Sequence, residues 1–395
     1  MGIKISDKGA RVAPSSTLAI DAKFKAMKAE GIDAVGFGTG EPDFDTPDHI
    51  KAAAIEALNK GITKYTPASG TPKIKEAIVR KLKRENNLDY KATDIVVSNG
   101  AKHSLTNVFA AICNPGDEVI IPAPYWVSYP EMVKLADGVP VVLETTEESD
   151  FKFTPEMLEK VITEKTIALI LCSPSNPTGS VYSIDELRAI ADFCVKKNII
   201  VVSDEVYEHL VYEGETCSIA TLGDEIKALT IVVNAVSKTY AMTGWRIGYT
   251  ACEANLAKVM GNIQSHETSN PNSIAQEAAI AALDGSLDCV KEMKKHFLER
   301  RNYMVERINK IDGLSCRMPK GAFYVMMNIS KIKGRVINGV TINTSDDFCN
   351  LILEKALVAL VAGSGFGNDD FVRWSYAASM KDIEKGLDRL EEFLK

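Results

Sequence analysis

The central part of the chain alternates between apolar runs and amphipathic segments. The apolar runs are nearly continuous, which is typical of parallel strands that are covered on both faces. Helical patterns lie between them, so this part of the chain predicts an α/β layer with right-handed crossover connections. The predicted strands are 94–98, 118–122, 139–144, 166–173, 199–205, 229–237 and 245–252.

The clearest predicted helix covers residues 183–198. Ser183 and Glu186 have the spacing of a capping box, in which each side chain bonds a backbone N–H of the other residue. Lysines precede Asn198 at the far end, and asparagine tolerates the left-handed conformation that often ends a helix. Both ends of this helix are therefore predicted from local sequence alone.

The two ends of the chain have a different pattern. Residues 15–31 predict a helix that ends at Gly31. The C-terminal part predicts a long charged helix at 289–311 and a second helix at 345–356. Four short strands are predicted at 314–319, 322–330, 358–363 and 371–377, and a last helix begins with a capping signal at 379–382. We expect a smaller α+β domain that the N-terminal segment joins, so that this domain is discontinuous. The expected division is 1–46 (N-terminal segment), 47–284 (large domain) and 285–395 (small C-terminal domain).

Composition narrows the class of protein. The chain has 395 residues, 46% of them hydrophobic, and a net charge of −7, which argues against a nucleic-acid-binding protein with a broad basic face. No apolar run reaches the length of a transmembrane helix, so no membrane partner is expected. The eight cysteines are scattered and the five histidines form no H-x-x-x-H pair. Reduced thiols in a cytoplasmic protein without a metal site are therefore expected.

Polar and charged residues follow the predicted strands, at the edge where an open α/β sheet binds ligands. After the strand predicted at 94–98, a glycine turn at 99–100 opens a helix whose first N–H groups can bind a phosphate. Other strand ends present an amide, a carboxylate with a phenol, an amine and a guanidinium. These side chains belong to Asn176, Asp204, Tyr207, Lys238 and Arg246.

Each of these features alone also has a purely structural explanation. Asp204 could cap a helix, residues 174–179 could form a plain β-turn, and Lys238 could extend its amine into solvent. Their convergence at successive strand ends favours one cofactor. Pyridoxal phosphate needs a lysine for its aldehyde, a carboxylate for its ring nitrogen and a positively charged cradle for its phosphate.

Nine motifs show which family the chain is similar to. They are GEPDFDTP (40–47), KYTPASG (64–70), SNGAKHSL (98–105), PAPYWVSYP (122–130), SPSNPTG (173–179), SDEVYEHLVYEGE (203–215), SKTYAMTGWRIGY (237–249), GAFYVMMN (321–328) and VRWSYA (372–377). With them the chain resembles, essentially end to end, the class I pyridoxal-phosphate-dependent aminotransferases of the bacterial aspartate aminotransferase type. The resemblance implies a fold-type I enzyme: a large domain with a mostly parallel seven-stranded sheet, and a smaller discontinuous α+β domain.

The resemblance implies a role at the cofactor for each matching residue. Lys238 holds the aldehyde of the cofactor as a Schiff base and, once the substrate releases it, acts as the general base. Asp204 pairs with the ring nitrogen, while Tyr207 and Asn176 hydrogen-bond the phenolic oxygen. The remaining implied contacts are Trp126 stacked on the ring, Gly100, Ala101, Lys102, Ser237 and Arg246 at the phosphate, and Tyr65 at the phosphate of a neighbouring subunit. The match at Tyr65 implies a homodimer with shared active sites.

The resemblance also implies how a substrate is held. Arg373 and the backbone of Gly40 bind the α-carboxylate, beside Trp126 and Asn176; a planar guanidinium suits a carboxylate. The side-chain carboxylate is assigned to Lys102, Ser15 and Thr17. Lys102 could instead be a solvated first-turn residue. A cation is unfavourable at a helix N-terminus, however, which favours an anionic ligand there.

Taken together, these residues imply transamination of L-aspartate with 2-oxoglutarate to oxaloacetate and L-glutamate by a ping-pong mechanism. The alternatives within the fold are aminotransferases for alanine, aromatic amino acids or prephenate, and a carbon–sulfur lyase. Lys102 argues against the lyase and the alanine preference. Relatives that use prephenate carry a basic residue where this chain has Ala13, and Arg11 is two residues away. A non-enzymatic regulator is not expected, because the chain shows no helix-turn-helix segment before the fold and its net charge is negative.

Overall fold

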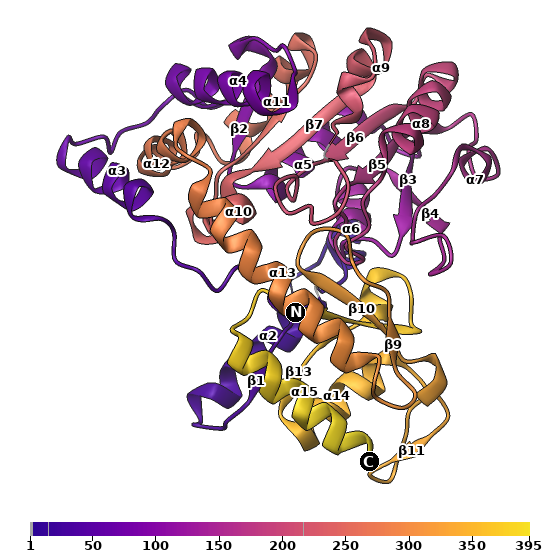
Figure 1. Cartoon of the computed structure of the whole chain (residues 1–395). Coiled ribbons are helices and arrows are strands. Elements are labelled where there is room, and N and C mark those ends of the chain that lie inside the picture. The colour runs from indigo at the N-terminus through magenta and orange to yellow at the C-terminus, as the bar shows by residue number, and fades with distance from the viewer. Residues whose placement is uncertain (1–2, 15, 216) are drawn as a thin grey trace.

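The computed structural model describes residues 3–14, 16–215 and 217–395, with only the backbone described for 16–18. Its largest element is a seven-stranded sheet in the upper part of Figure 1, with strand order β2-β8-β7-β6-β5-β3-β4. In this order, every two neighbouring strands from β7 to β4 run parallel, whereas β8 runs antiparallel to its neighbours β2 and β7. The predicted mostly parallel seven-stranded sheet is confirmed. Its strands are β2 (Ile95–Ser98), β3 (Glu118–Ala123), β4 (Val139–Glu144), β5 (Thr166–Cys172), β6 (Ile200–Asp204), β7 (Thr230–Ala235) and β8 (Gly248–Ala251).

Helices cover both faces of this sheet because successive side chains of a strand point to opposite faces. In β2, Ile95 and Val97 pack on one face and Val96 packs on the other. Every residue of β7 is buried for the same reason, which explains why the apolar runs are nearly continuous. The first face is covered by α3 (Asp48–Asn59), α4 (Pro72–Asn86), α7 (Pro155–Glu159), α8 (Ile184–Lys197), α9 (Asp224–Leu229) and α12 (Ser273–Asp284), and the second by α5 (Ala101–Ile112), α6 (Tyr129–Leu135) and α11 (Ala254–Glu267).

Helix α8 confirms the most detailed local prediction. Ser183 Oγ accepts a hydrogen bond from Glu186 N at 3.3 Å, and a Glu186 carboxylate oxygen accepts one from Ser183 N at 2.7 Å. Asn198 ends the helix with a φ of 55°, in the left-handed region. Ser183 and Glu186 are only three positions apart in sequence, and Asn198 directly follows the helix. Local pattern was therefore sufficient to predict both ends.

The lower part of Figure 1 combines both ends of the chain. β1 (Val35–Gly36) pairs in parallel with β13 (Val358–Ala359), and α2 (Ser16–Ala29) lies beside them. Lys385 and Arg389 of α15 (Met380–Leu394) pair with Asp33. Further elements here are α13 (Asp288–Ile308) and α14 (Ser345–Ala356). A sheet of order β14-β15-β10-β9 is formed by Val361–Ala362, Phe371–Ser375, Tyr324–Asn328 and Ser315–Cys316, and β11 (Val336–Ile337) pairs with β12 (Val340–Thr341). The residue numbers of the domain boundaries stay a prediction.

Several predicted strands have different bounds in the structure, and three of these differences bear on the fold or the site. The strand predicted at 245–252 begins only at Gly248, because 243–245 form a 3₁₀ turn and Arg246 has a φ of 58°. The strand predicted at 229–237 ends at Ala235 and continues into the helical turn α10 (Val236–Thr239). The segment 358–363 holds two strands, β13 and β14, in different sheets. The first two differences place Ser237, Lys238 and Arg246 in turns at the sheet edge.

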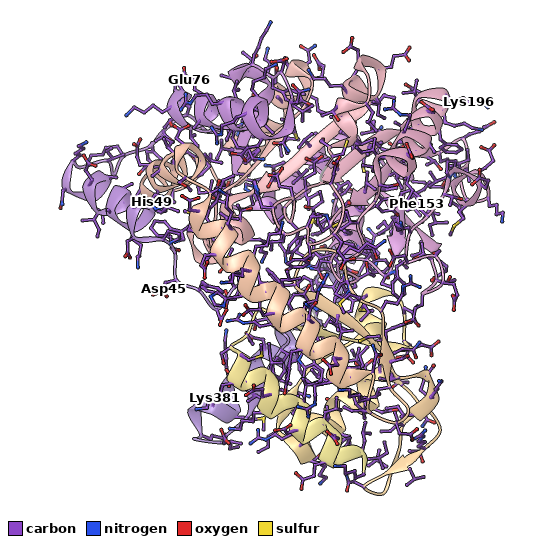
Figure 2. The ribbon with its side chains drawn as sticks, in the orientation of Figure 1. Asp45, His49, Glu76, Phe153, Lys196 and Lys381 are labelled. Carbon is purple, nitrogen blue, oxygen red and sulfur yellow. The ribbon has the colours of Figure 1, made fainter. Side chains whose placement is uncertain are left out.

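Charged side chains lie mainly on the outside of the molecule. Figure 2 shows the exposed Glu76, Lys196 and Lys381 at its periphery, while Phe153 is buried under the helices of the large sheet. Within the part of the chain that the structure describes, no helix combines the length and the apolar character needed to span a membrane.

Candidate active site

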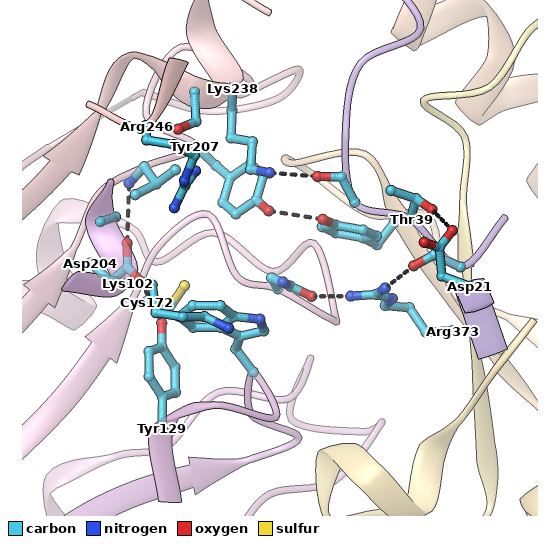
Figure 3. A pocket seen from close by; sticks show the side chains of 18 residues that line it. Asp21, Thr39, Lys102, Tyr129, Cys172, Asp204, Tyr207, Lys238, Arg246 and Arg373 are labelled. Carbon is cyan, nitrogen blue, oxygen red and sulfur yellow. Dashed lines mark hydrogen bonds between the residues drawn. The ribbon is translucent and has the colours of Figure 1, made fainter. Parts of the chain in front are cut away.

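A cavity of about 230 Å³ opens at the carboxyl ends of the parallel strands, where it faces the loop of residues 38–40. Figure 3 shows side chains from both halves of the molecule pointing into it. The predicted site residues that line it are Gly40, Ala101, Lys102, Trp126, Asn176, Asp204, Tyr207, Ser237, Lys238, Arg246 and Arg373. The structure thus brings together the residues that follow the strand ends and others that only the resemblance indicated, such as Gly40, Trp126 and Arg373.

The remaining predicted site residues lie elsewhere or outside the description. Gly100 directly precedes the cavity-lining Ala101. Tyr65 is 91% exposed in the single chain and does not line the cavity. Ser15 lies outside the described residues, and Thr17 belongs to α2 with only its backbone described. The roles predicted for Ser15, Thr17 and Tyr65 therefore stay predictions.

Lys238 lies in the turn after β7, and its amine points into the cavity. The Nζ atom donates a hydrogen bond to the carbonyl oxygen of Gly40 at 2.5 Å. Burial lowers the pKa of Lys238 to about 8; Glu41 opposes this shift, while Arg246 and Arg373 act in the same direction. A substantial fraction of this amine is therefore neutral near pH 8, as a nucleophile or a base requires.

Asp204 is a buried carboxylate at the end of β6. Its oxygens accept hydrogen bonds from the Tyr129 hydroxyl at 2.6 Å and from Val206 N at 3.3 Å. Burial raises the pKa of Asp204, and these two hydrogen bonds and the charge of Lys238 act against that rise. Such a carboxylate favours a cationic partner in the cavity, because an uncompensated buried charge is costly.

The start of α5 forms an anion cradle. Gly100 caps this helix with a φ of 84°, and a Cβ atom at that position would collide with the guanidinium of Arg246. Arg246 is held there by hydrogen bonds to the carbonyl oxygens of Thr243, at 2.8 Å, and Asn99, at 3.3 Å. A guanidinium beside a helix N-terminus suits a phosphate, since both carry positive charge and N–H donors.

Arg373, in β15, is a buried cation with unused donor capacity. It is 2% exposed, and its Nη1 and Nη2 atoms donate to Asn176 Oδ1 at 2.9 Å and to the carbonyl oxygen of Gly38 at 2.6 Å. Its Nε atom is buried without a hydrogen-bond partner, and Arg373 forms no ion pair with any described carboxylate. Burial lowers its pKa, yet an arginine stays protonated. The arrangement therefore calls for an anionic ligand.

Tyr207 faces the cavity but has a partner that the sequence reasoning did not name. Its hydroxyl lies 2.9 Å from the Tyr324 hydroxyl, while Asn176 Oδ1 is used by Arg373. A Cβ atom at Gly40 would collide with the Tyr324 hydroxyl, so only glycine fits there. The prediction that Tyr207 and Asn176 meet at one oxygen of the cofactor stays a prediction.

Seven further residues line the cavity that the sequence did not predict: Asp21, Gly38, Thr39, Tyr129, Cys172, Val206 and Tyr324. Three of them had a usable signal. Tyr129, Val206 and Tyr324 stand inside the motifs PAPYWVSYP, SDEVYEHLVYEGE and GAFYVMMN. The hydrogen bond between Thr39 Oγ1 and Asp21 Oδ1, 2.7 Å long, joins two segments that no local pattern connects.

Lys102, in the first turn of α5, lies at the mouth of the cavity. It is exposed in the single chain, and its Nζ atom stands 5.0 Å from the centre of the Trp126 ring. Partial burial and the charge of Arg246 lower the pKa of Lys102. A cation so placed, against the helix dipole and beside a second cation, is stabilised by an anion from outside.

These residues fit pyridoxal phosphate. The cradle of Gly100 and Arg246 suits its phosphate, the buried carboxylate of Asp204 suits a protonated ring nitrogen, and Trp126 offers an aromatic face. Lys238 supplies the amine for its aldehyde. Arg373 remains free for a carboxylate of the substrate.

Comparison with known proteins assigns the chain to a family. The sequence model of the family described as Aminotransferase class I and II matches residues 32–390. The chain therefore belongs to the class I and II aminotransferases. The predicted class of enzyme is confirmed, and pyridoxal phosphate is the cofactor of this family.

Similar proteins cover the chain from end to end. An aspartate aminotransferase of Geobacillus stearothermophilus is 48% identical and covers 99% of both chains. An aspartate/prephenate aminotransferase of Nitrosomonas europaea is 46% identical over 99% of this chain and 100% of its own length. The solved structure of Thermus thermophilus aspartate aminotransferase with maleate has a TM-score of 0.94 at 40% identity and covers 100% of both chains.

Proposed function

We propose that this chain transfers the amino group of L-aspartate to 2-oxoglutarate, with oxaloacetate and L-glutamate as products, by a ping-pong mechanism. The observation that carries the proposal is a pair of cations that line the same cavity: the buried Arg373, which has no carboxylate partner among the described residues, and Lys102 at the mouth, over the ring of Trp126. Two cations suit the two carboxylates of aspartate. The names of the Geobacillus relative and of the Thermus structure, which holds the dicarboxylate maleate, support this choice.

In this mechanism Arg373 orients the amino acid. Its position is fixed by Asn176 and by the carbonyl oxygen of Gly38, so its remaining donors present a rigid fork to the α-carboxylate. Lysine could not substitute well, because it lacks the planar fork. Lys102 binds the second carboxylate, which sets the preference for aspartate and glutamate over neutral amino acids.

Lys238 moves the proton. Its lowered pKa of about 8 leaves part of the amine neutral under mild conditions, and that neutral amine accepts the α-proton of the bound amino acid. Pyridoxal phosphate, when bound, supplies an electron-withdrawing ring that stabilises the negative charge left at the α-carbon. The negative charge of Asp204 would stabilise a proton on the ring nitrogen, and a hydrogen bond from Tyr129 holds the Asp204 carboxylate in place.

We also propose a homodimer in the cytoplasm. Tyr65 is 91% exposed and lies away from the cavity of its own chain, which supports a contact with the phosphate site of a second copy. Ile55 and Leu58 are exposed apolar side chains on α3, near Tyr65 in sequence. All eight cysteines are free, which supports a reducing compartment.

The proposal does not extend to prephenate, although the Nitrosomonas relative is named for it. Ala13 stands where a basic residue is expected, and its backbone N–H donates to Glu131 at 3.0 Å. Arg11 is exposed and its Nη2 atom lies 3.9 Å from an Asp137 oxygen, at the surface. Neither residue places a cation in the cavity.

The substrate test is the Lys102→Ala variant. We expect kcat/KM for aspartate to fall about tenfold, the worth of one charge-assisted hydrogen bond, while kcat/KM for alanine stays unchanged. Steady-state kinetics with aspartate, alanine, phenylalanine, prephenate and cystathionine measure this, and the neutral substrates serve as the internal control. A wild-type protein that prefers alanine over aspartate by tenfold, or an equal loss for both substrates, would contradict the assignment of Lys102.

A further inference from the structure

The turn that carries Asp204 and Tyr207 also carries two buried carboxylates that the proposed mechanism does not use. Asp204 and Tyr207 line the cavity, whereas Glu205 and Glu208 do not. Both glutamates are nevertheless buried. Side chains spaced three apart thus share a side of this turn. Glu205 accepts hydrogen bonds from Ser203 and Ser218, Glu208 accepts them from other residues, and none of these donors lines the cavity.

Glu208 is surrounded by three hydrogen-bond donors from two distant parts of the chain. Its Oε1 atom accepts from Lys81 Nζ, on α4, and from Asn234 Nδ2, on β7, at 2.6 Å. Its Oε2 atom accepts from Asn86 Nδ2 at 2.5 Å. Lys81 in turn donates to Asn86 Oδ1 at 2.7 Å. We call these four residues, Lys81, Asn86, Glu208 and Asn234, the Glu208 network.

The Glu208 network is satisfied by the protein itself. Lys81, Glu208 and Asn234 are each 6% exposed or less. Burial raises the pKa of Glu208, but the charges of Lys81 and His209 outweigh it and hold this pKa at about 2. Glu85 and His209 border the network, with Glu85 Oε2 3.8 Å from Lys81 Nζ and 3.1 Å from His209 Nε2. Each described polar atom of the Glu208 and Lys81 side chains has a hydrogen-bond partner, unlike the Nε atom of Arg373.

Asn234 connects the network to the lysine of the active site. Its Oδ1 atom accepts a hydrogen bond from Ala235 N at 2.7 Å, and Ala235 leads directly into the turn that holds Ser237 and Lys238. Glu208 directly follows Tyr207. The hydrogen bond between Glu208 and Asn234 therefore joins the turn after β6 to the end of β7, from which the turn of Lys238 begins.

We propose that the Glu208 network is a positioning device that holds Asp204 and Tyr207 at a set distance from Lys238. The hydrogen bond from Asn234 to Glu208 transmits the position, while the buried Lys81 anchors Glu208 to α4, a helix that contributes no residue to the cavity. The inference rests on the roles proposed above for Asp204, Tyr207 and Lys238. A displacement of about 1 Å at such residues is sufficient to lower a catalytic rate about 100-fold.

Two double variants separate position from stability. Lys81→Met with Glu208→Gln removes both buried charges but keeps an acceptor for Asn234, and Asn86 can turn its amide to face the new one. Lys81→Met with Glu208→Met also removes both charges and leaves Asn234 without that acceptor. Neither variant leaves a buried charge unpaired, which would be the dominant defect of a single substitution.

We expect the Glu208→Met double variant to lose kcat/KM about 10- to 100-fold. This variant should also bind pyridoxal phosphate more weakly than wild type. The near-ultraviolet and visible absorbance of the bound cofactor should change with pH at a midpoint that differs from wild type by roughly 0.5 pH unit or more. The Glu208→Gln double variant should stay within about threefold of wild type in kcat/KM and keep the wild-type midpoint. Lys152→Met, which breaks the ion pair with Glu186 on α8, is the control for lost stability.

The measurements are pH titration of the bound cofactor's absorbance, its dissociation constant, urea unfolding and steady-state kinetics, all on the holoenzyme. Two equal double variants, both like wild type or both impaired alike, would overturn the inference. If the Glu208→Met protein does not fold, Asn234→Ala in the wild-type background removes the same hydrogen bond, and an unchanged midpoint there overturns the inference. A wild-type protein that binds no pyridoxal phosphate overturns the proposed function, whereas a normal wild type with equal variants overturns only this inference.

Discussion

The two sides of the turn after β6 hold buried charges in opposite ways. On the cavity side, Arg373 has a buried Nε without a partner and Lys238 has a pKa lowered to about 8. On the other side, Glu208 accepts from three donors and its pKa stays at about 2. An ion that the protein satisfies completely contributes to structure, while an ion left with unused donors awaits a ligand. The difference is one of partners, because both sides are buried.

The comparison is tested most strongly at Lys238. Lys238→Ala should lower kcat by at least about 10³-fold, since both the nucleophile and the general base are lost. The free energy of unfolding of the cofactor-free protein should not fall. The substitution removes an amine whose positive charge is destabilised by burial. Steady-state kinetics, cofactor absorbance and urea unfolding check the three parts. A variant that keeps the absorbance of wild type would contradict the role of Lys238.

The next effect concerns Glu205, on the protein-satisfied side. Burial and the charge of Glu208 raise the pKa of Glu205 to about 7, against hydrogen bonds from Ser218 and Ser203. Between the ordinary glutamate pKa and about 7, the folded state binds more protons than the unfolded state. The contribution of Glu205 to stability is therefore present at low pH and is lost as pH rises to about 7, by about 3 kcal/mol in all.

Glu205→Gln is the matched variant, because its amide oxygen can still accept from both serines. Unfolding of wild type and variant between pH 5 and 8 should show a wild-type stability that declines relative to the variant as pH rises. Glu208 adds no slope in this range, since its pKa is about 2. Parallel stability curves would mean that Glu205 is ionised throughout and that its pKa is not raised.

The smallest effect is expected at Tyr129, whose hydroxyl donates one of the two hydrogen bonds that the cavity residue Asp204 accepts. Tyr129→Phe removes the donor that holds Asp204, so the pKa of Asp204 should rise further above its ordinary value. We expect kcat/KM to fall about tenfold, the worth of one hydrogen bond to a charged group, with the acid limb of the pH profile moved to higher pH. An unchanged pH profile would show that Val206 N and the ring nitrogen are sufficient to hold Asp204.

The amino-acid sequence alone determined the strands of the large sheet and, through the resemblance, the class of enzyme. Strands buried on both faces appear as apolar runs, and the capping box of Ser183 and Glu186 lies within four residues, so local pattern contains this information. The strand-end residues Asp204 and Lys238 were predicted because parallel strands bring their carboxyl ends to one edge. The resemblance then connected them to a cofactor.

Only the tertiary structure decided the partners of these residues. Arg373 and Gly38 are 335 residues apart, and Glu208 and Lys81 are 127 apart. Strands of two residues, such as β1 and β13, are too short for a periodic pattern, so their pairing depends on the packing of both chain ends. The free Nε of Arg373, the pKa of Lys238 and the opposite facing of Asp204 and Glu208 all follow from such long-range contacts. Hydrogen bonding and burial depend on which atoms meet in space, and a linear pattern does not contain that information.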